Sequence, residues 1–346
     1  MFAIFLSLIA AVTYENHADL MILNDKDGIS RPIVSIADWE IRRNHILENM
    51  QLVMGDIPAK SDAPLNIEYD LAATIHGDGY TRHKIWYTPE PGDRVPAYLL
   101  VPNDMGVPAP AMLCPHPTNP DGKDMVVGLV DKANRNYAEE LAQRGYVTLA
   151  PDYPGFGEYK PGVYAMGYAS ATAKGIVNHR RALDVLASLS YVDSEKLGVI
   201  GHSLGGHNAL YLATFDDRVK VAVTSCGFNS FAKYKGGDLT GWSHKGYMPR
   251  IAERYDRDPA KMPFDFTEIL GVIAPRRVFI SAPLHDANFE VSGVYDCIKA
   301  AAPVYALYDA SDDLQAVHPD CEHDFPPTTR EQAYRFIDDT FNIKRN

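Results

Sequence analysis

Cysteine is scarce in this chain. The 346 residues contain four cysteines, Cys114, Cys226, Cys297 and Cys321, and none of them belongs to a C-x-x-C pair. Zinc ribbons need such pairs, and disulfide-stabilised proteins need a far higher cysteine density. The sequence therefore indicates neither kind of protein, and it leaves the redox compartment and the disulfide status of the four thiols open.

Positive charge is also in short supply. Lys and Arg number 33 and Asp and Glu number 45, which gives a formal net charge of −12 at pH 7. Proteins that bind nucleic acid concentrate Lys and Arg on one surface. The charge balance therefore argues against a nucleic-acid partner and favours small neutral or cationic substrates. It does not fix the oligomeric state.

The sequence shows no stable membrane span. Residues 1–14 are apolar apart from Ser7, Thr13 and Tyr14, but this stretch is too short to cross a bilayer. Its length suits the apolar part of a secretory signal, although the basic start is missing and the cleavage site is indistinct. We therefore predict a signal segment at 1–14 and export to the periplasm or the medium. The alternatives are a cytoplasmic protein and an N-terminal strand or helix packed on the body.

The chain beyond residue 102 alternates strand-like with helix-like segments. The predicted strands are 109–114, 146–150, 196–200, 219–225, 277–281 and 314–318, and the predicted helices are 131–144, 171–189, 204–214, 265–273, 291–301 and 329–341. This alternation predicts an α/β fold with a mostly parallel central sheet and helices on both faces. Functional loops of such folds lie at the carboxyl ends of the strands.

Two regions depart from the alternation. Residues 15–64 predict an N-terminal helical extension, because apolar side chains recur at helical spacing from Ser35 to Met54 and Gly55 then ends the helix. The catalytic domain is expected to span 65–346 and to begin with antiparallel hairpins. Residues 227–263, called the lid segment below, are rich in glycine and aromatic side chains, which predicts a lid or cap before the acid strand; a surface insertion is the alternative.

The most informative stretch is Gly201-His202-Ser203-Leu204-Gly205, between a strand-like and a helix-like run. A serine hydroxyl is a weak nucleophile at neutral pH, so serine hydrolases hold it on a sharp strand-to-helix turn beside a base and amide donors. Glycines two positions before and after the serine permit that turn. We predict that Ser203 is the nucleophile. The alternative is a glycine-rich turn in which Ser203 only caps the next helix.

The partners of the nucleophile are expected downstream, in the order Ser, Asp or Glu, His. Asp286 lies in the loop after the strand-like run 277–281, so it is the predicted orienter of the base. His318 and His323 follow it. His323 lies in a loop and is the predicted base, whereas His318 would end a strand. The competing carboxylates are Asp296, Asp309, Asp312 and Asp313, which are more typical of helix or turn positions.

The other histidines considered are weaker candidates for proton transfer or metal binding. His202 and His207 flank the nucleophile, and we expect them to shape the elbow and the helix face without transferring protons. His318, Cys321 and His323 imitate the spacing of metal ligands, but no partner motif such as H-E-x-x-H accompanies them. We therefore predict no metal.

An oxyanion hole needs two donors. The amide of Leu204 stands at a helix start, where free N–H groups point outward. The second donor is expected in the loop after strand 109–114, and because Pro117 has no N–H, Thr118 is the candidate. The predicted substrate-binding residues are Tyr153 and Phe156 after strand 146–150, and Trp242 and Tyr247 in the lid segment.

These residues together resemble the α/β-hydrolase superfamily, and within it dienelactone-hydrolase-related proteins and acetyl xylan esterases. The resemblance is carried by Gly201–Gly206, Ala150–Gly157, Pro283–Asp286 and His323–Pro326. It implies the α/β-hydrolase fold and an acyl-enzyme mechanism without cofactor, with Ser203 attacking and His323 transferring the proton. Dienelactone hydrolases proper use a cysteine where this chain has Ser203, which favours an ester hydrolase. Esters attached to polysaccharides are the implied substrate class.

Two other functions compete with the esterase. A peptidase of the prolyl-oligopeptidase type shares the order of the three residues and a G-x-S-x-G-G elbow, but it usually carries a large N-terminal propeller, which residues 1–80 cannot supply. A non-catalytic member of the same fold would bind a partner instead. Turnover of esters or of amides, and labelling of Ser203, distinguish the three.

Overall fold

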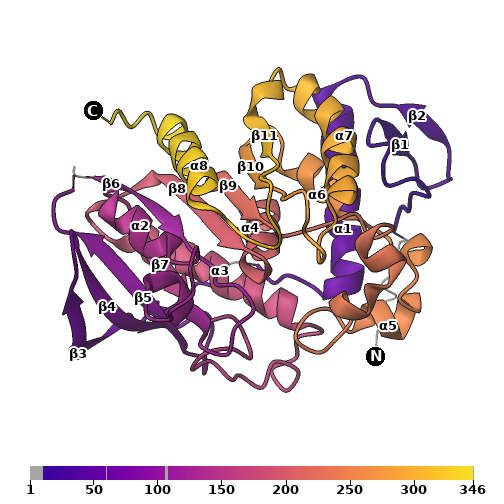
Figure 1. Ribbon diagram of the computed structural model, residues 1–346. Helices are drawn as coiled ribbons and strands as arrows, with labels where there is room; N and C mark the ends of the chain where they lie inside the picture. Colours follow the sequence, from indigo (N-terminus) through magenta and orange to yellow (C-terminus); the bar gives the residue numbers. More distant parts are fainter. Residues whose placement is uncertain (1–10, 60, 106–107, 346) are drawn as a thin grey trace.

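The computed structural model describes residues 11–59, 61–105 and 108–345. A nine-stranded sheet runs through the molecule in the order β11-β10-β9-β8-β6-β7-β5-β4-β3 (Figure 1). The parallel strands are β6 Ala109–Leu113, β7 Val147–Pro151, β8 Val192–His202, β9 Val219–Ser225, β10 Arg277–Ser281 and β11 Leu314–Val317. Antiparallel β3 Glu68–His76, β4 Tyr80–Tyr87 and β5 Val95–Pro102 extend the sheet beyond β7. The predicted hairpins and the parallel sheet are confirmed.

Helices cover both faces of this sheet. α2 Tyr137–Gln143 and α8 Pro327–Thr340 pack on one face. The helices packed on or behind the other face are α3 Ala171–Ser188, α4 Leu204–Phe215, α6 Phe266–Ile273 and α7 Val291–Leu307. The pleat of the strands divides the core accordingly: Val199 joins one apolar cluster and Ile200, the next residue, joins the other. The prediction of an α/β-hydrolase fold is confirmed.

The N-terminal region is tied to the body of the protein. α1 Ile36–Met54 begins where the Ser35 side chain accepts from the Asp38 amide and ends at Gly55, as the sequence predicts. Its buried Trp39 belongs to the same apolar cluster as side chains of the central sheet and its helices. The structure adds a small ribbon that the sequence analysis missed, β1 Ile22–Asn24 paired with β2 Ser30–Pro32. These strands have three residues each, too few for a period-two pattern.

The predicted signal segment falls mostly outside the described residues. Tyr14, its last residue, is buried under the guanidinium of Arg42, and the carbonyl of Val12 accepts from the Asn49 side chain. Residues 12–14 therefore pack on α1. None of the helices in the described parts of the chain combines the length and apolar composition that a membrane span needs.

One predicted helix begins later than expected. The sequence predicts a helix over 131–144, but α2 starts only at Tyr137. Asn134 has a φ of 65°, in the left-handed region that a right-handed helix cannot contain. This turn releases the side chains of Asn134 and Arg135 toward the loop around His323.

Three predicted ends were also short. α7 runs on to Leu307 with Pro303 inside it, whereas the predicted helix ended at residue 301. β8 is longer at both ends than the predicted 196–200.

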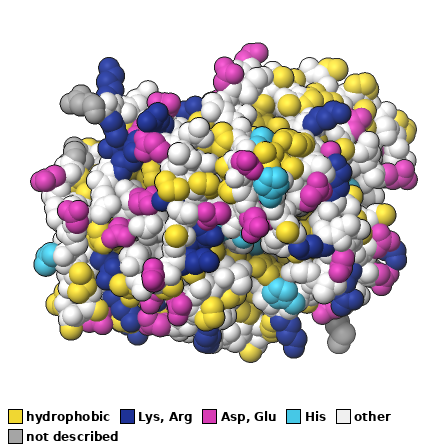
Figure 2. Space-filling view, in the orientation of Figure 1, with side chains coloured by type: hydrophobic (Ala, Val, Ile, Leu, Met, Phe, Trp, Pro, Cys, Tyr) yellow, Lys and Arg dark blue, Asp and Glu magenta, His cyan; other side chains and the backbone are white. Residues whose placement is uncertain are grey.

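The lid segment joins β9 to α6 through short helices. They are η2 Tyr234–Gly237, η3 Leu239–Trp242, α5 Arg250–Tyr255 and η4 Pro259–Lys261; η1 Gly122–Val127 and η5 Ser311–Asp313 lie elsewhere. Phe231, Trp242 and Met248 are buried, so the segment has an apolar interior of its own that is continuous with the main cluster. On the face of the molecule shown in Figure 2, basic and acidic side chains are interspersed.

Candidate active site

Ser203 stands on a strained turn between β8 and α4. Its φ and ψ are 54° and −117°, a backbone conformation that residues other than glycine rarely adopt. Its N–H donates to the carbonyl of Ser225 at the end of β9, at 2.8 Å. A Cβ on Gly201 would collide with the carbonyl of Gly205, so the turn needs glycine there. The Ser203 side chain is half-buried, which leaves its hydroxyl within reach of a substrate.

Asp286 and His323, the predicted orienter and base, lie in hydrogen-bond contact. The Nδ1–H of His323 donates to Oδ2 of Asp286 at 2.9 Å, across 37 residues of chain. The other oxygen of Asp286 accepts from the amides of Asn288 and Phe289, at 2.8 and 3.0 Å. Burial raises the pKa of Asp286, but the bonds from His323 and the two amides outweigh it, so the pKa lies below its ordinary value. The carboxylate is therefore held ionised and fixed against the imidazole.

The His323 ring lies next to the turn that carries Ser203. Its centroid is 4.9 Å from that of His202, the residue before Ser203. Its side chain is 31% exposed, whereas that of Asp286 is fully buried. The imidazole is thus open on one side and held on the other, an arrangement that suits proton transfer.

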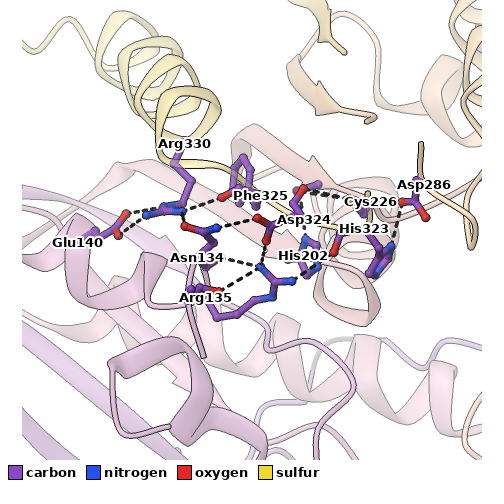
Figure 3. A network of polar contacts seen from close by, with 12 residues as sticks. Asn134, Arg135, Glu140, His202, Cys226, Asp286, His323, Asp324, Phe325 and Arg330 are labelled. Carbon is purple, nitrogen blue, oxygen red and sulfur yellow. Dashed lines mark hydrogen bonds and ion pairs between the residues drawn. The ribbon is translucent and has the colours of Figure 1, made fainter. Parts of the chain in front are cut away.

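A polar network anchors the loop that carries His323 (Figure 3). Arg135 donates to a carboxylate oxygen of Asp324 at 2.6 Å and to the carbonyl of His323 at 3.3 Å. Asn134 donates to the other oxygen of Asp324 at 2.6 Å. Arg330 of α8 donates to the backbone carbonyl of Phe325 and to the side-chain oxygen of Asn134. The turn before α2 thereby fixes the position of the loop.

Three other histidines near the site, His202, His207 and His318, lie in surroundings that suit a structural role. Burial holds the pKa of His202 well below its ordinary value, and its Nδ1 lies 3.1 Å from the hydroxyl of Ser225. Burial likewise lowers the pKa of His207 to about 3. His318 donates to the carbonyl of Ala282 and packs its ring on Tyr295. These surroundings support the prediction that none of the three is the base.

The start of α4 faces the loop predicted to complete the oxyanion hole. A Cβ on Gly205 would collide with the carbonyl of Pro115, so Pro115 and His116 lie directly against the helix start. Thr118 is exposed, and its hydroxyl lies 3.4 Å from that of Tyr247. His116 joins this loop to the next one: its Nδ1–H donates to the carbonyl of Pro117 and its Nε2 accepts from the amide of Tyr153.

Three of the four predicted substrate-binding residues gather beside Leu204. Tyr153, Phe156 and Tyr247 form one apolar cluster with it. Tyr153 is buried and donates to the carbonyl of Gly246 in the lid segment. Trp242 lies outside this cluster: it is 2% exposed, as Tyr153 is, and packs against Phe231 and Phe289. Its ring centroid lies 5.9 Å from that of Tyr247, so the indole supports Tyr247 from the apolar interior.

Arg135, Asn134 and Cys226 are the residues near the site that sequence reasoning missed. Cys226 follows β9, with its thiol near Asp286 and 3.3 Å from the carbonyl of Asp324. The only signal available was the resemblance of His323–Pro326, which includes Asp324 but says nothing of its partners. Arg135 and Asp324 are 189 positions apart in the chain.

Comparison with known proteins agrees with this architecture. The model of the prolyl oligopeptidase family matches residues 134–343, and that of an abhydrolase family matches residues 28–162. YtaP of Bacillus subtilis (strain 168), a protein named as a hydrolase, is 29% identical over 259 residues, 71% of this chain and 83% of its own.

Two solved structures share the fold at low identity. A glucuronoyl esterase from Solibacter usitatus has a TM-score of 0.73 at 20% identity, over 96% of this chain and 99% of its own. A carbohydrate esterase family 15 glucuronoyl esterase from Caldicellulosiruptor kristjansonii has a TM-score of 0.71 at 18% identity, over 98% and 94%. The protein is thus a hydrolase of the α/β-hydrolase superfamily. Within that superfamily, the chain belongs to the prolyl oligopeptidase family.

Proposed function

We propose that this protein is a serine-dependent carboxylic ester hydrolase in which Ser203, His323 and Asp286 form the catalytic triad. The observation that carries the proposal is the 2.9 Å bond between His323 and a buried, ionised Asp286, beside a serine on a strained turn. Strain of this kind gathers at functional sites, where the surrounding structure holds it.

The mechanism follows from the positions of the groups. Oγ of Ser203 attacks the ester carbonyl carbon while Nε2 of His323 takes its proton. Asp286 keeps the other ring proton on Nδ1 and stabilises the imidazolium. The imidazolium then protonates the leaving alcohol, which leaves an acyl-serine. Water, deprotonated by His323, attacks that acyl group, and the proton returns to Ser203 as the acid is released.

Two amides are proposed to hold the oxyanion. The Leu204 amide is at the N-terminus of α4, where the first N–H groups have no partner within the helix. The Thr118 amide is the second, because its loop approaches that helix start through Pro115 and His116. Loss of one such donor costs about 3 kcal/mol of transition-state stabilisation.

The proposed substrate is an acyl ester attached to a carbohydrate. Two solved structures with this fold are named as glucuronoyl esterases. Phe156 and Tyr247, both partly exposed beside Leu204, offer apolar surface and a phenol hydroxyl, a combination that suits a sugar ring. Export, predicted from the apolar start of the chain, would place the enzyme with such substrates.

A peptidase is the second candidate, because the matching family takes its name from prolyl oligopeptidase. Within the described residues, however, the chain before β4 forms a short ribbon, α1 and an edge strand. A propeller that would restrict the site to peptides is not among these described elements.

The test compares three substrates with one probe. The purified protein is given p-nitrophenyl acetate, the methyl ester of glucuronic acid and a fluorogenic dipeptide amide, and a fluorophosphonate is used to label the active serine. We expect ester turnover and labelling of Ser203. Faster turnover of the amide would establish the peptidase, and a protein that neither turns over substrate nor takes the label would be a binding member of the fold.

A further inference from the structure

Cys226 lies beside the acid and the base of the proposed triad, although the mechanism has no use for it. Its sulfur, a carboxylate oxygen of Asp286 and a ring nitrogen of His323 all lie within 4.8 Å of one another. The three side chains converge at one corner of the network in Figure 3. They come from the ends of β9 and β10 and from the loop after β11.

The position of Cys226 is set by the backbone. Its N–H donates to the carbonyl of Ser281 at 2.9 Å, which ties it to the end of β10. Its φ of 48° turns the chain away from the strand direction there. The residue is 3% exposed, so the thiol is aimed at the triad by the fold instead of sampling solvent.

A sulfur, an imidazole nitrogen and a carboxylate oxygen are the protein ligands that zinc prefers, and three of them with an open fourth position make a typical exchangeable site. Bond lengths of about 2.0–2.3 Å place such ligands roughly 3.3–3.6 Å apart. Nδ1 of His323 and Oδ2 of Asp286 are 2.9 Å apart and must separate slightly to hold one ion. The partly exposed imidazole gives an ion its way in.

We propose that Cys226, Asp286 and His323 form an inhibitory binding site for a thiophilic divalent cation such as Zn²⁺ or Cd²⁺. The inhibition, though not the binding, rests on the proposed function.

The ion acts by rearranging protons. It takes the lone pair of Nδ1, so the single ring proton of the neutral imidazole moves to Nε2, and the thiol proton of Cys226 goes to the solvent. His323 then has no lone pair with which to accept the proton of Ser203. Asp286, occupied by the ion, no longer orients the imidazole. Removal of the ion by a chelator reverses every step.

Binding is tested apart from activity. Cd²⁺ is titrated into the purified protein while the ultraviolet charge-transfer absorption of the cadmium–thiolate bond is recorded. The variants are Cys226→Ser, which nearly preserves shape, and Cys321→Ser as the matched control, since Cys321 is in the His323 loop and outside the trio. We expect the band in the wild type, in Cys321→Ser and in Ser203→Ala, and its loss in Cys226→Ser. A missing band in the wild type, or one that survives in Cys226→Ser, overturns the proposal.

Inhibition is measured on the same proteins. Zn²⁺ should inhibit p-nitrophenyl acetate hydrolysis by the wild type and by Cys321→Ser, with full recovery after addition of a chelator. Cys226→Ser should need at least about tenfold more Zn²⁺. Equal inhibition of wild type and Cys226→Ser overturns the proposal. If the Cys226-dependent band forms in a protein that hydrolyses no ester, the site stands and the proposed esterase function fails.

Discussion

Arg135 donates two hydrogen bonds to the loop that carries His323, one to a carboxylate oxygen of Asp324 at 2.6 Å and one to the carbonyl of His323 at 3.3 Å. A lysine can keep the first contact but lacks the planar fork needed for both. We expect Arg135→Lys to lower kcat about tenfold with little change in KM, because the imidazole loses its fixed position. Arg144→Lys, in the pair with Glu331 and Asp338, is the matched control. Equal kinetic loss in both variants, or a change in melting temperature alone, would contradict the positioning role.

The two late histidines should separate sharply. His323→Ala should lower kcat by at least about 10³-fold, because the proton acceptor is lost. His318→Ala removes a bond to the Ala282 carbonyl and a contact with Tyr295, so it should change kcat only a few-fold and lower the melting temperature. Steady-state hydrolysis of p-nitrophenyl acetate measures both. Similar losses of kcat would mean that His323 is not the base.

Asp286 should matter for activity and for the pH dependence of stability. Asp286→Asn should lower kcat by about 10³–10⁴-fold, since the amide favours the wrong tautomer of His323. The folded pKa of Asp286 lies below the unfolded value of 3.8. Its carboxylate therefore stabilises the protein above that value, and the contribution is lost as the pH falls through the folded pKa.

The measurement for this linkage is the melting temperature of wild type and Asp286→Asn from about pH 7 to about pH 3. The advantage of the wild type should be largest near neutrality and should shrink toward the acid end. A difference that stays constant or grows on acidification would contradict the lowered pKa.

The aromatic residues should divide into two groups. Tyr247→Phe removes a hydroxyl next to Thr118, so it should raise KM for sugar-linked esters more than for p-nitrophenyl acetate. Trp242→Phe leaves a cavity in the lid segment and should cost about 1–3 kcal/mol of unfolding free energy, with a smaller effect on KM. If both variants change KM equally for large and small esters, Tyr247 does not touch the substrate.

Much of this structure could be predicted from local patterns of the sequence. The strand before Ser203, the helix after it and the two glycines around it are neighbours in the chain, so their pattern predicts the elbow directly. Asp286 and His323 could be chosen because each follows a strand of a parallel sheet, and the ends of such strands meet at one edge.

Other features depend on contacts that no local pattern encodes. The left-handed turn at Asn134 shortened a predicted helix, yet asparagine only tolerates that conformation and does not require it. Arg135 and Asp324 come together through packing of α2 and α8 on the same face of the sheet. Aromatic content alone also cannot tell an exposed ring from a buried one, and the rings of Tyr153 and Trp242 are both buried.

The central claim is tested most directly by mapping the serine that reacts with a fluorophosphonate and by assaying its alanine variant. The covalent adduct should be found by peptide mass spectrometry on Ser203, and Ser203→Ala should lose the label and at least about 10³-fold of kcat while it keeps its circular dichroism spectrum. Ser225→Ala, the neighbour whose hydroxyl faces His202, should still be labelled. An adduct on another residue, or ester hydrolysis that survives in Ser203→Ala, would contradict the account.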